Sequence, residues 1–175
     1  MTKLALTAIA VLGACLALVG CGGTGANMQP LKTVDHVDLG RYLGTWYEVA
    51  RYPTRFQKDC VRSEASYSLR EDGDIRVVNT CHTAGGGSRS IEGKAWVVEK
   101  STNAKLKVRF FWPFSGAYWI IELGASYEYA VIGHPGRKYL WILSRTPAMD
   151  PALFAAVCSR LPSYGYDASK LVKDQ

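Results

Sequence analysis

The sequence predicts an all-β domain, an eight-stranded up-and-down antiparallel barrel with one C-terminal α-helix packed on its outside. Short runs of β-branched and aromatic residues recur from about residue 45 to residue 145, and turn-forming residues separate them. Apolar and polar residues alternate within several of these runs. A single segment with helical spacing follows the last run. Many short strands joined by short turns are typical of an antiparallel barrel.

Each expected strand is bounded by a turn. The clearest turn is Asp72-Gly73, because this pair favours the tight connection of a β-hairpin. Other turns are expected at 85–87, 101–103, 113–116 and 135–136. The eight expected strands lie near 45–51, 61–70, 74–81, 89–99, 105–111, 117–123, 128–133 and 139–145.

Alternation along the strands predicts which residues face the barrel interior. In 106–110, Leu106, Val108 and Phe110 share one face while two cations share the other. The interior of an eight-stranded barrel is filled by side chains or holds one small ligand. An apolar tube with a few polar groups suits a fatty acid, a lysophospholipid or a similar amphiphile. The candidate ligand-binding residues, for each of which ordinary packing is the alternative, are Glu48, Ala65, Tyr67, Val77, Asn79, Val108, Phe110, Tyr118 and Ile120.

One helix is expected to begin after Asp150, a residue type that caps helices well, with Pro151 in the first turn. Its apolar residues, which include Cys158, recur at helical spacing from Leu153 to Leu161. We expect this stripe to pack on the outer wall of the barrel.

The first residues predict processing as a lipoprotein. Lys3 precedes an apolar run that is too short to span a bilayer as a helix and is typical of a signal peptide. The run ends in 18–21, Leu-Val-Gly-Cys, which resembles the lipobox of bacterial lipoproteins. We therefore expect residues 1–20 to be a signal peptide. Cys21 would carry a diacylglycerol thioether and an amide-linked chain such as palmitate, and residues 21–35 would form a lipidated tether.

Two alternatives to this processing are an uncleaved membrane helix and an ordinary secreted protein. Gly22, rather than an acidic residue, follows Cys21. Resemblance to enteric lipoproteins then favours the outer membrane over the inner one.

Charge and motifs exclude several functions. The formal net charge of +6 is modest, and no stripe of cations interleaved with stacking aromatics is present, which argues against nucleic-acid binding. His36, His82 and His134 lack metal-ligand spacing, and no nucleophile motif is found. We expect no metal, no cofactor and no catalytic residue.

Two segments carry a family resemblance. Residues 42–51 (YLGTWYEVAR) resemble the opening Gly-x-Trp block of the lipocalins, and 139–147 (YLWILSRTP) resemble their closing block. Between them, 67–69, 110–114 and 127–131 also match in order and spacing. The resemblance covers about residues 36–172, so 36–175 is expected to be a lipocalin domain. It implies a carrier at the outer membrane, facing the periplasm, that stores or transports lipids under stress; a homodimer is left open.

The resemblance also assigns structural roles to Gly44, Trp46 and Arg145. Trp46 is expected to plug the closed end of the barrel, and Arg145 to lie over its indole in a cation–π contact. One departure is 125–127, which reads Ala-Ser-Tyr where many lipocalins have Thr-Asp-Tyr. The missing aspartate removes a hydrogen bond of that loop.

Three cysteines remain besides the anchor, in a compartment that favours disulfides. If Asp72-Gly73 closes the hairpin of the second and third strands, Cys60 and Cys81 lie together at its opposite, open end. We expect them to form a disulfide, with Cys158 a small apolar residue on the helix.

The sequence leaves two further points open. Phe56 and 112–114 fall on loops at the open end, where they would gate access, dip into a bilayer or form a packed lid. The alternatives to a carrier are a thiol-based, isomerase-like enzyme that uses reduced Cys60 and a structural envelope protein with a filled barrel.

Overall fold

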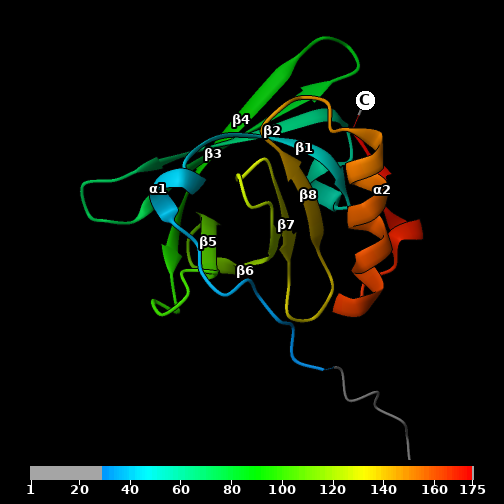
Figure 1. The fold of residues 1–175 in the computed structure, drawn as a ribbon. Coiled ribbons are helices and arrows are strands. Elements are labelled where there is room, and N and C mark those ends of the chain that lie inside the picture. The colour runs from blue at the N-terminus through cyan, green and yellow to red at the C-terminus, as the bar shows by residue number, and fades with distance from the viewer. Residues whose placement is uncertain (1–28, 175) are drawn as a thin grey trace, which may run out of the picture.

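The computed structural model describes residues 29–174, so the predicted signal peptide and Cys21 lie outside the described residues. Eight strands close into an antiparallel barrel, as the sequence predicts (Figure 1). Consecutive strands pair from β2 to β8, and β1 pairs with both β8 and β2. The strands are β1 (Gly44–Arg51), β2 (Cys60–Leu69), β3 (Ile75–Thr83), β4 (Ser88–Val97), β5 (Lys105–Phe111), β6 (Phe114–Leu123), β7 (Tyr129–Gly133) and β8 (Leu140–Ser144).

A ninth strand, β9 (Val172–Lys173), was not expected from the sequence. It pairs with the end of β1, where Ala50 lies opposite Lys173. The main chain of Asp174 also donates to the carbonyl of Val49 at 3.0 Å. The C-terminal end of the chain therefore extends the sheet beside the end of β1.

Helix α2 (Pro151–Arg160) packs on the outside of the barrel, as predicted (Figure 1). Asp150 caps it, because its carboxylate accepts a hydrogen bond from the main chain of Leu153 at 2.9 Å. Val157 is fully buried against the wall formed by β7 and β8. The other helical segments are α1 (Leu39–Tyr42), η1 (Arg55–Gln57), η2 (Leu161–Tyr164) and η3 (Ala168–Lys170), and within residues 29–174 no helix is long and apolar enough to cross a bilayer.

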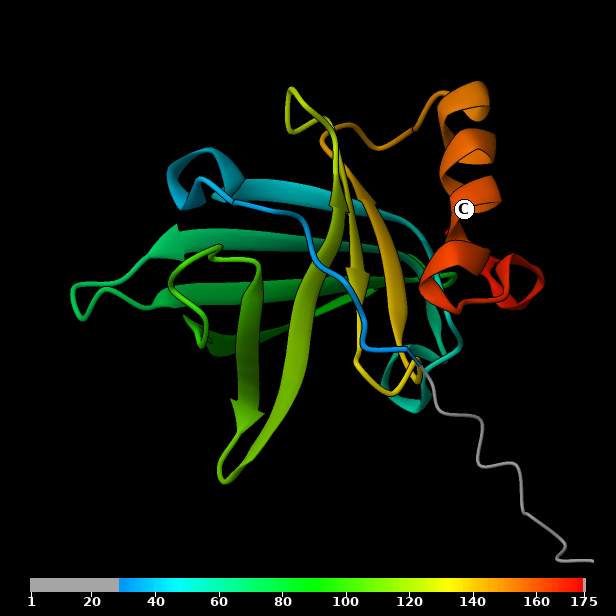
Figure 2. The same cartoon turned by 60° about the horizontal axis from the view of Figure 1, so that its bottom comes forward.

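The up-and-down order places the connections alternately at two ends. We call the end with α1 and the turns 70–74, 98–104 and 124–128 the closed end. The segments 52–59, 84–87, 112–113 and 134–139 lie at the other end, the open end. Figure 2 shows the β5–β6 hairpin pointing away from α1.

The expected strand boundaries hold within a few residues, with one consequential difference. The turn predicted over 113–116 is confined to Trp112 and Pro113, because Phe111 and Phe114 are already paired across β5 and β6. The hairpin therefore ends in a narrow tip rather than in a broad loop.

The segment before the barrel packs against it. Leu31 is buried, and the main chain of Val34 donates to the carbonyl of Ile120 at 3.1 Å. The predicted tether covers 21–35, and its last residues thus lie on the barrel, because Leu31 and Val34 bury apolar surface there. Residues 21–28 of the tether lie outside the described part of the chain.

Candidate functional site

The nine residues predicted to face inward all lie on the inner wall of the barrel. Seven of them belong to the apolar cluster inside it or pack against that cluster. Glu48 lies opposite Leu143 of this cluster, and Asn79 lies opposite Ala65. The structure thus brings the predicted set together on one surface.

The closed end is sealed by Trp46. Its indole is fully buried, and its Nε1 donates to the carbonyl of Tyr42 at 2.8 Å. The guanidinium of Arg145 lies 3.9 Å from the centre of the indole, which is the predicted cation–π contact. Arg145 also donates to the main-chain carbonyls of Thr45 at 3.0 Å and Tyr127 at 3.3 Å. One side chain therefore ties the first strand, the last strand and the β6–β7 turn together.

Gly44 is required by the backbone conformation at the start of β1. Its φ of +92° is a conformation that residues with a side chain rarely adopt. A Cβ at this position would stand 3.4 Å from the Arg145 guanidinium, which is an ordinary van der Waals contact. The glycine of the Gly-x-Trp block is therefore explained by its φ angle and not by the space beside the arginine.

The β6–β7 turn keeps a carboxylate hydrogen bond despite the missing aspartate. Glu128 accepts from the main chain of Ser126 at 3.0 Å. The hydroxyl of Tyr127 accepts from the main chain of Asp38 at 2.8 Å, and Arg41 lies 4.0 Å from the centre of its ring. The departure at 125–127 is thus compensated by neighbouring side chains.

Three tyrosine hydroxyls meet deep in the barrel. Tyr118 contacts the hydroxyls of Tyr42 at 2.7 Å and Tyr67 at 2.9 Å. Burial raises the pKa of Tyr67 to about 12 and raises the pKa of Tyr118 as well, so these groups stay neutral near pH 7. Tyr42 was not among the residues predicted from the sequence, because it precedes the first strand and so has no place in the alternation of inward and outward residues.

A cluster of polar side chains lines the β1–β2 side nearer the open end; we call Glu48, Arg51, Gln57, Ser63 and Asp174 the mouth cluster. A β-bulge between Glu48 and Ala50 shifts the register of β1 against β8. Arg51 therefore shares the inner face with Glu48, although strict alternation would place it outside. Arg51 donates to Glu48 at 2.8 Å and also to Asp174.

Gln57 and Ser63 complete the mouth cluster. Gln57 donates to the second oxygen of Glu48 at 2.8 Å, and the main chain of Ser63 donates to Asp174 at 2.6 Å. Burial and the neighbouring Asp174 carboxylate raise the pKa of Glu48 to about 7. Burial raises the pKa of Asp174 too. Glu48 was the one member of the mouth cluster among the predicted site residues, because the bulge and the C-terminal strand leave no clear sequence pattern.

The opposite side of the interior is apolar and less covered. Val108 and Phe110 are only partly buried although they point inward, so this part of the inner wall is accessible to solvent. Asn79 is also partly buried, and its Oδ1 has no hydrogen-bond partner. Gly93 faces Val77, and a Cβ there would stand 2.6 Å from the Phe110 ring, so the glycine makes room for that ring. The accessible inner wall thus combines an apolar surface with a few polar groups.

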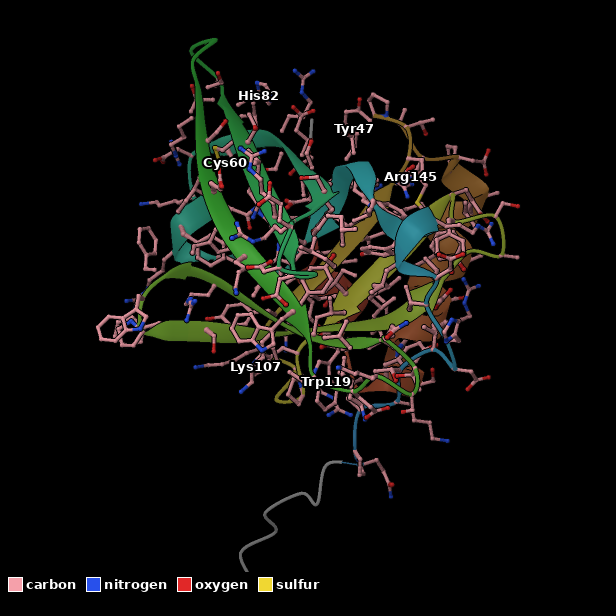
Figure 3. All side chains as sticks on the ribbon, turned by 90° about the vertical axis from the view of Figure 1, so that its left-hand side faces the viewer. Tyr47, Cys60, His82, Lys107, Trp119 and Arg145 are labelled. Carbon is pink, nitrogen blue, oxygen red and sulfur yellow. A yellow bond between two sulfur atoms is a disulfide. The ribbon has the colours of Figure 1, made fainter. Side chains whose placement is uncertain are left out.

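The predicted disulfide is confirmed. Cys60 and Cys81 are bonded at the open end, with their Cα atoms 5.3 Å apart. Figure 3 shows Cys60 and Arg145 toward opposite ends of the barrel. Cys158 is a free thiol on α2, partly buried as expected for a small apolar residue.

A groove of about 580 Å³ lies outside the barrel between β1 and α2. Tyr47, Val49, Phe154 and Cys158 contribute to its lining, and Lys173 stands at its edge with its ammonium 4.5 Å from the centre of the Phe154 ring. The lining residues other than Glu48 and Asp174 come from the outer wall, from α2 and from their connections. The groove therefore meets the inner surface only at Glu48 and at Asp174 of the mouth cluster.

The histidines form no site with one another. His82 faces Glu64 at 3.9 Å on the outside of the barrel, and His134 packs edge-on against Tyr139 in the β7–β8 turn. Within residues 29–174 no group of three His, Cys, Asp or Glu side chains is placed to hold a metal ion.

Comparisons with known proteins agree with this geometry. The family model of the lipocalin-like domain matches residues 37–175. The outer membrane lipoprotein Blc of Escherichia coli K12 is 38% identical over 165 residues, covering 94% of this chain and 93% of that protein. Temperature-induced lipocalin-1 of Arabidopsis thaliana is 41% identical over 155 residues, covering 83% and 82%.

A solved structure extends the comparison to the fold. Insecticyanin from the tobacco hornworm Manduca sexta superimposes with a TM-score of 0.67 at 22% identity. The match covers 83% of this chain and 84% of that one. At this identity the likeness concerns the fold alone.

Proposed function

Because this chain belongs to the lipocalin-like family, we propose that it is a membrane-anchored carrier for fatty acids, lysophospholipids or similar amphiphiles. The proposed binding surface is the inner wall of the barrel. Its residues are those predicted from alternation, together with the mouth cluster and Tyr42.

The observation that carries the proposal is the difference between the two ends of the inner wall. Trp46 and Tyr42 are fully buried at the closed end, whereas Val108 and Phe110 remain partly exposed on the inner wall. An acyl chain gains about 0.8 kcal/mol for each CH₂ group removed from water. The polar groups of an amphiphile would meet the mouth cluster or Asn79, whose Oδ1 is buried and has no hydrogen-bond partner.

We further propose that the chain is held at the outer membrane by acyl groups on Cys21, with its body facing the periplasm. Similarity to proteins named outer membrane lipoprotein supports this location. The lipobox-like residues before Cys21 support the anchor. The carrier would then store or transport lipids of that membrane under stress, alone or as a homodimer.

Both alternatives have less support. The thiol-based enzyme requires a reduced Cys60, and Cys60 is bonded to Cys81. The structural protein requires a filled barrel, and the partly exposed inward side chains of Val108, Phe110 and Asn79 speak against complete filling.

Native mass spectrometry of gently extracted, acylated protein tests the proposal. We expect a co-purified lipid that is lost on delipidation and regained at one molecule per chain on titration with a fatty acid or lysophospholipid. A delipidated protein that binds none of a series of both lipid classes would contradict the proposed cargo. A chain without acyl groups at Cys21 would contradict only the proposed anchor.

A further inference from the structure

The tip of the β5–β6 hairpin exposes three aromatic side chains. Phe111, Trp112 and Phe114 are 68%, 82% and 77% exposed. Because Phe111 pairs with Phe114, only Trp112 and Pro113 form the turn, and the hairpin extends beyond the neighbouring strands (Figure 2). The structure therefore excludes the packed lid that the sequence left open. Tryptophan is enriched at the interface of a bilayer with water, where its ring meets apolar chains and its N–H stays wet.

A second aromatic residue lies at the same end. Phe56, in η1, is 62% exposed and stands between Arg55 and Lys58 in the chain. The open end thus presents exposed aromatic rings from two separate connections.

Charge differs in sign between the two ends. The four connections at the open end carry Arg55, Lys58, Arg137 and Lys138 against Asp59 alone, a net charge of +3. The three turns and α1 at the closed end hold five carboxylates and three cations, a net charge of −2. Each basic residue near an anionic membrane contributes about 1 kcal/mol of attraction. An anionic surface therefore attracts the open end and repels the closed end.

The path of the N-terminal segment also places the open end nearer to the proposed membrane anchor. From α1 at the closed end, the chain runs back along β6 to Gln29, whose carbonyl accepts from Arg137 in the β7–β8 turn at 2.7 Å. The segment thus leaves the barrel beside a connection of the open end. Residues 21–28 span at most roughly 28 Å when fully extended, which keeps an anchor on Cys21 within one barrel length of that end.

We propose that the aromatic tip, Phe111, Trp112 and Phe114, inserts into the interface of an anionic lipid bilayer, so that the open end faces the membrane surface. Phe56 and the cations of the open end meet the headgroups in this orientation. The identity of the molecule that passes through the opening rests on the proposed function. In this orientation an amphiphile would move between the bilayer and the barrel without crossing water.

Fluorescence quenching of the acylated protein in vesicles tests the orientation. The vesicles contain phosphatidylethanolamine and phosphatidylglycerol whose acyl chains carry bromine, a contact quencher of indole. We expect quenching of the wild-type protein to fall in Trp112→Phe, because this substitution removes one indole and keeps an aromatic ring. Trp119→Phe is the matched control, since Trp119 lies on the outer wall beneath Lys105, with the ammonium 5.1 Å from its ring centre. The control should remain quenched like the wild type.

A second measurement removes the apolar tip. In the triple variant Phe111→Ser, Trp112→Ser, Phe114→Ser, with Cys21→Ser to remove the anchor, we expect binding to the same vesicles at least about tenfold weaker than for Cys21→Ser alone. Equal binding of the two proteins, or equal quenching of the wild type and Trp112→Phe, would overturn the proposal. These outcomes are separable from the proposed cargo. If the tip inserts but the barrel never holds lipid, only the proposed cargo is contradicted. If the barrel holds lipid but the indole of Trp112 is not quenched, only the proposed orientation is contradicted.

Discussion

The two ends of the barrel differ in the kinds of side chain that they bury and expose. At the closed end an uncharged indole is buried under an arginine that makes only main-chain hydrogen bonds and one ring contact. At the open end the buried groups are charged, a disulfide joins two strands, and large apolar rings stand in solvent. The difference indicates that the closed end is stabilised by a buried aromatic side chain, and the open end by a disulfide and an ion pair. Substitutions matched between the ends test this division.

The largest effect is expected from a pair of tryptophans. Trp46→Ala leaves a cavity under Arg145 and should lower the free energy of unfolding by about 4 kcal/mol, as for other buried aromatic residues. Trp112→Ala removes an exposed ring and should change it by less than about 0.5 kcal/mol. Urea denaturation of the two variants measures both values. Similar losses would show that the ends do not differ in this way.

The disulfide should rank next. It closes a loop with a sequence separation of 21, which in the chain-entropy model contributes about 3 kcal/mol. The double variant Cys60→Ala, Cys81→Ala should lose this amount in thermal or urea unfolding. Cys158→Ala is the control and should lose about 1 kcal/mol or less, because Cys158 is unbonded and only partly buried. A double variant as stable as the control would show that the disulfide does not contribute to the stability of the open end.

A smaller effect is expected from Glu48, and it depends on pH. The pKa of Glu48 is raised from its ordinary 4.5 to about 7, chiefly by burial and then by Asp174. Between these values the native protein keeps a proton that the unfolded chain has released. Stability should therefore fall as pH rises from about 4.5 to 7, by about 2 kcal/mol, and change little from this group above pH 7.

Glu48→Gln separates this contribution from other carboxyl groups. The variant keeps a side chain that hydrogen-bonds and cannot ionise, so the decline over that pH range should become shallower. Chemical denaturation at a series of pH values measures the slope. An unchanged slope would mean that Glu48 does not hold the proton.

An effect no larger than that of Glu48 should come from the tyrosine cluster. Tyr118→Phe removes the hydroxyl that contacts both Tyr42 and Tyr67 and leaves the ring in place. Each lost hydrogen bond costs about 1 kcal/mol. Differential scanning calorimetry should detect a lower melting temperature. Tyr47→Phe, on the outer face of β1, is the control and should melt like the wild type.

The sequence was sufficient for features that depend on local pattern. Alternation placed Val108 and Phe110 on the inner wall, and Asp72-Gly73 placed Cys60 and Cys81 together. The family blocks identified the contact of Trp46 with Arg145. The alternation of apolar residues and the preferences of turn residues depend on only a few neighbouring residues. Both can therefore be read from a single sequence.

Features that depend on distant segments were not predicted. Arg51 faces inward because of a bulge whose register is set by the pairing of β1 with β8. Asp174 reaches Arg51 because the C-terminal strand pairs with β1, far away in the sequence. The exposure of the aromatic tip depends on the pairing of Phe111 with Phe114, which a proline-containing run does not reveal.

If an amphiphile binds the inner wall through the open end, its affinity should depend on the size of the side chains on that wall. Affinity for a fluorescent fatty acid can be compared between two variants of neighbouring residues in β5. Val108→Trp adds bulk to the inner wall, while Lys107→Trp adds the same ring to the exposed outer face (Figure 3). With circular dichroism showing that both variants are folded, we expect affinity at least about tenfold weaker for Val108→Trp and unchanged affinity for Lys107→Trp. Equal affinities of the two variants would contradict binding inside the barrel.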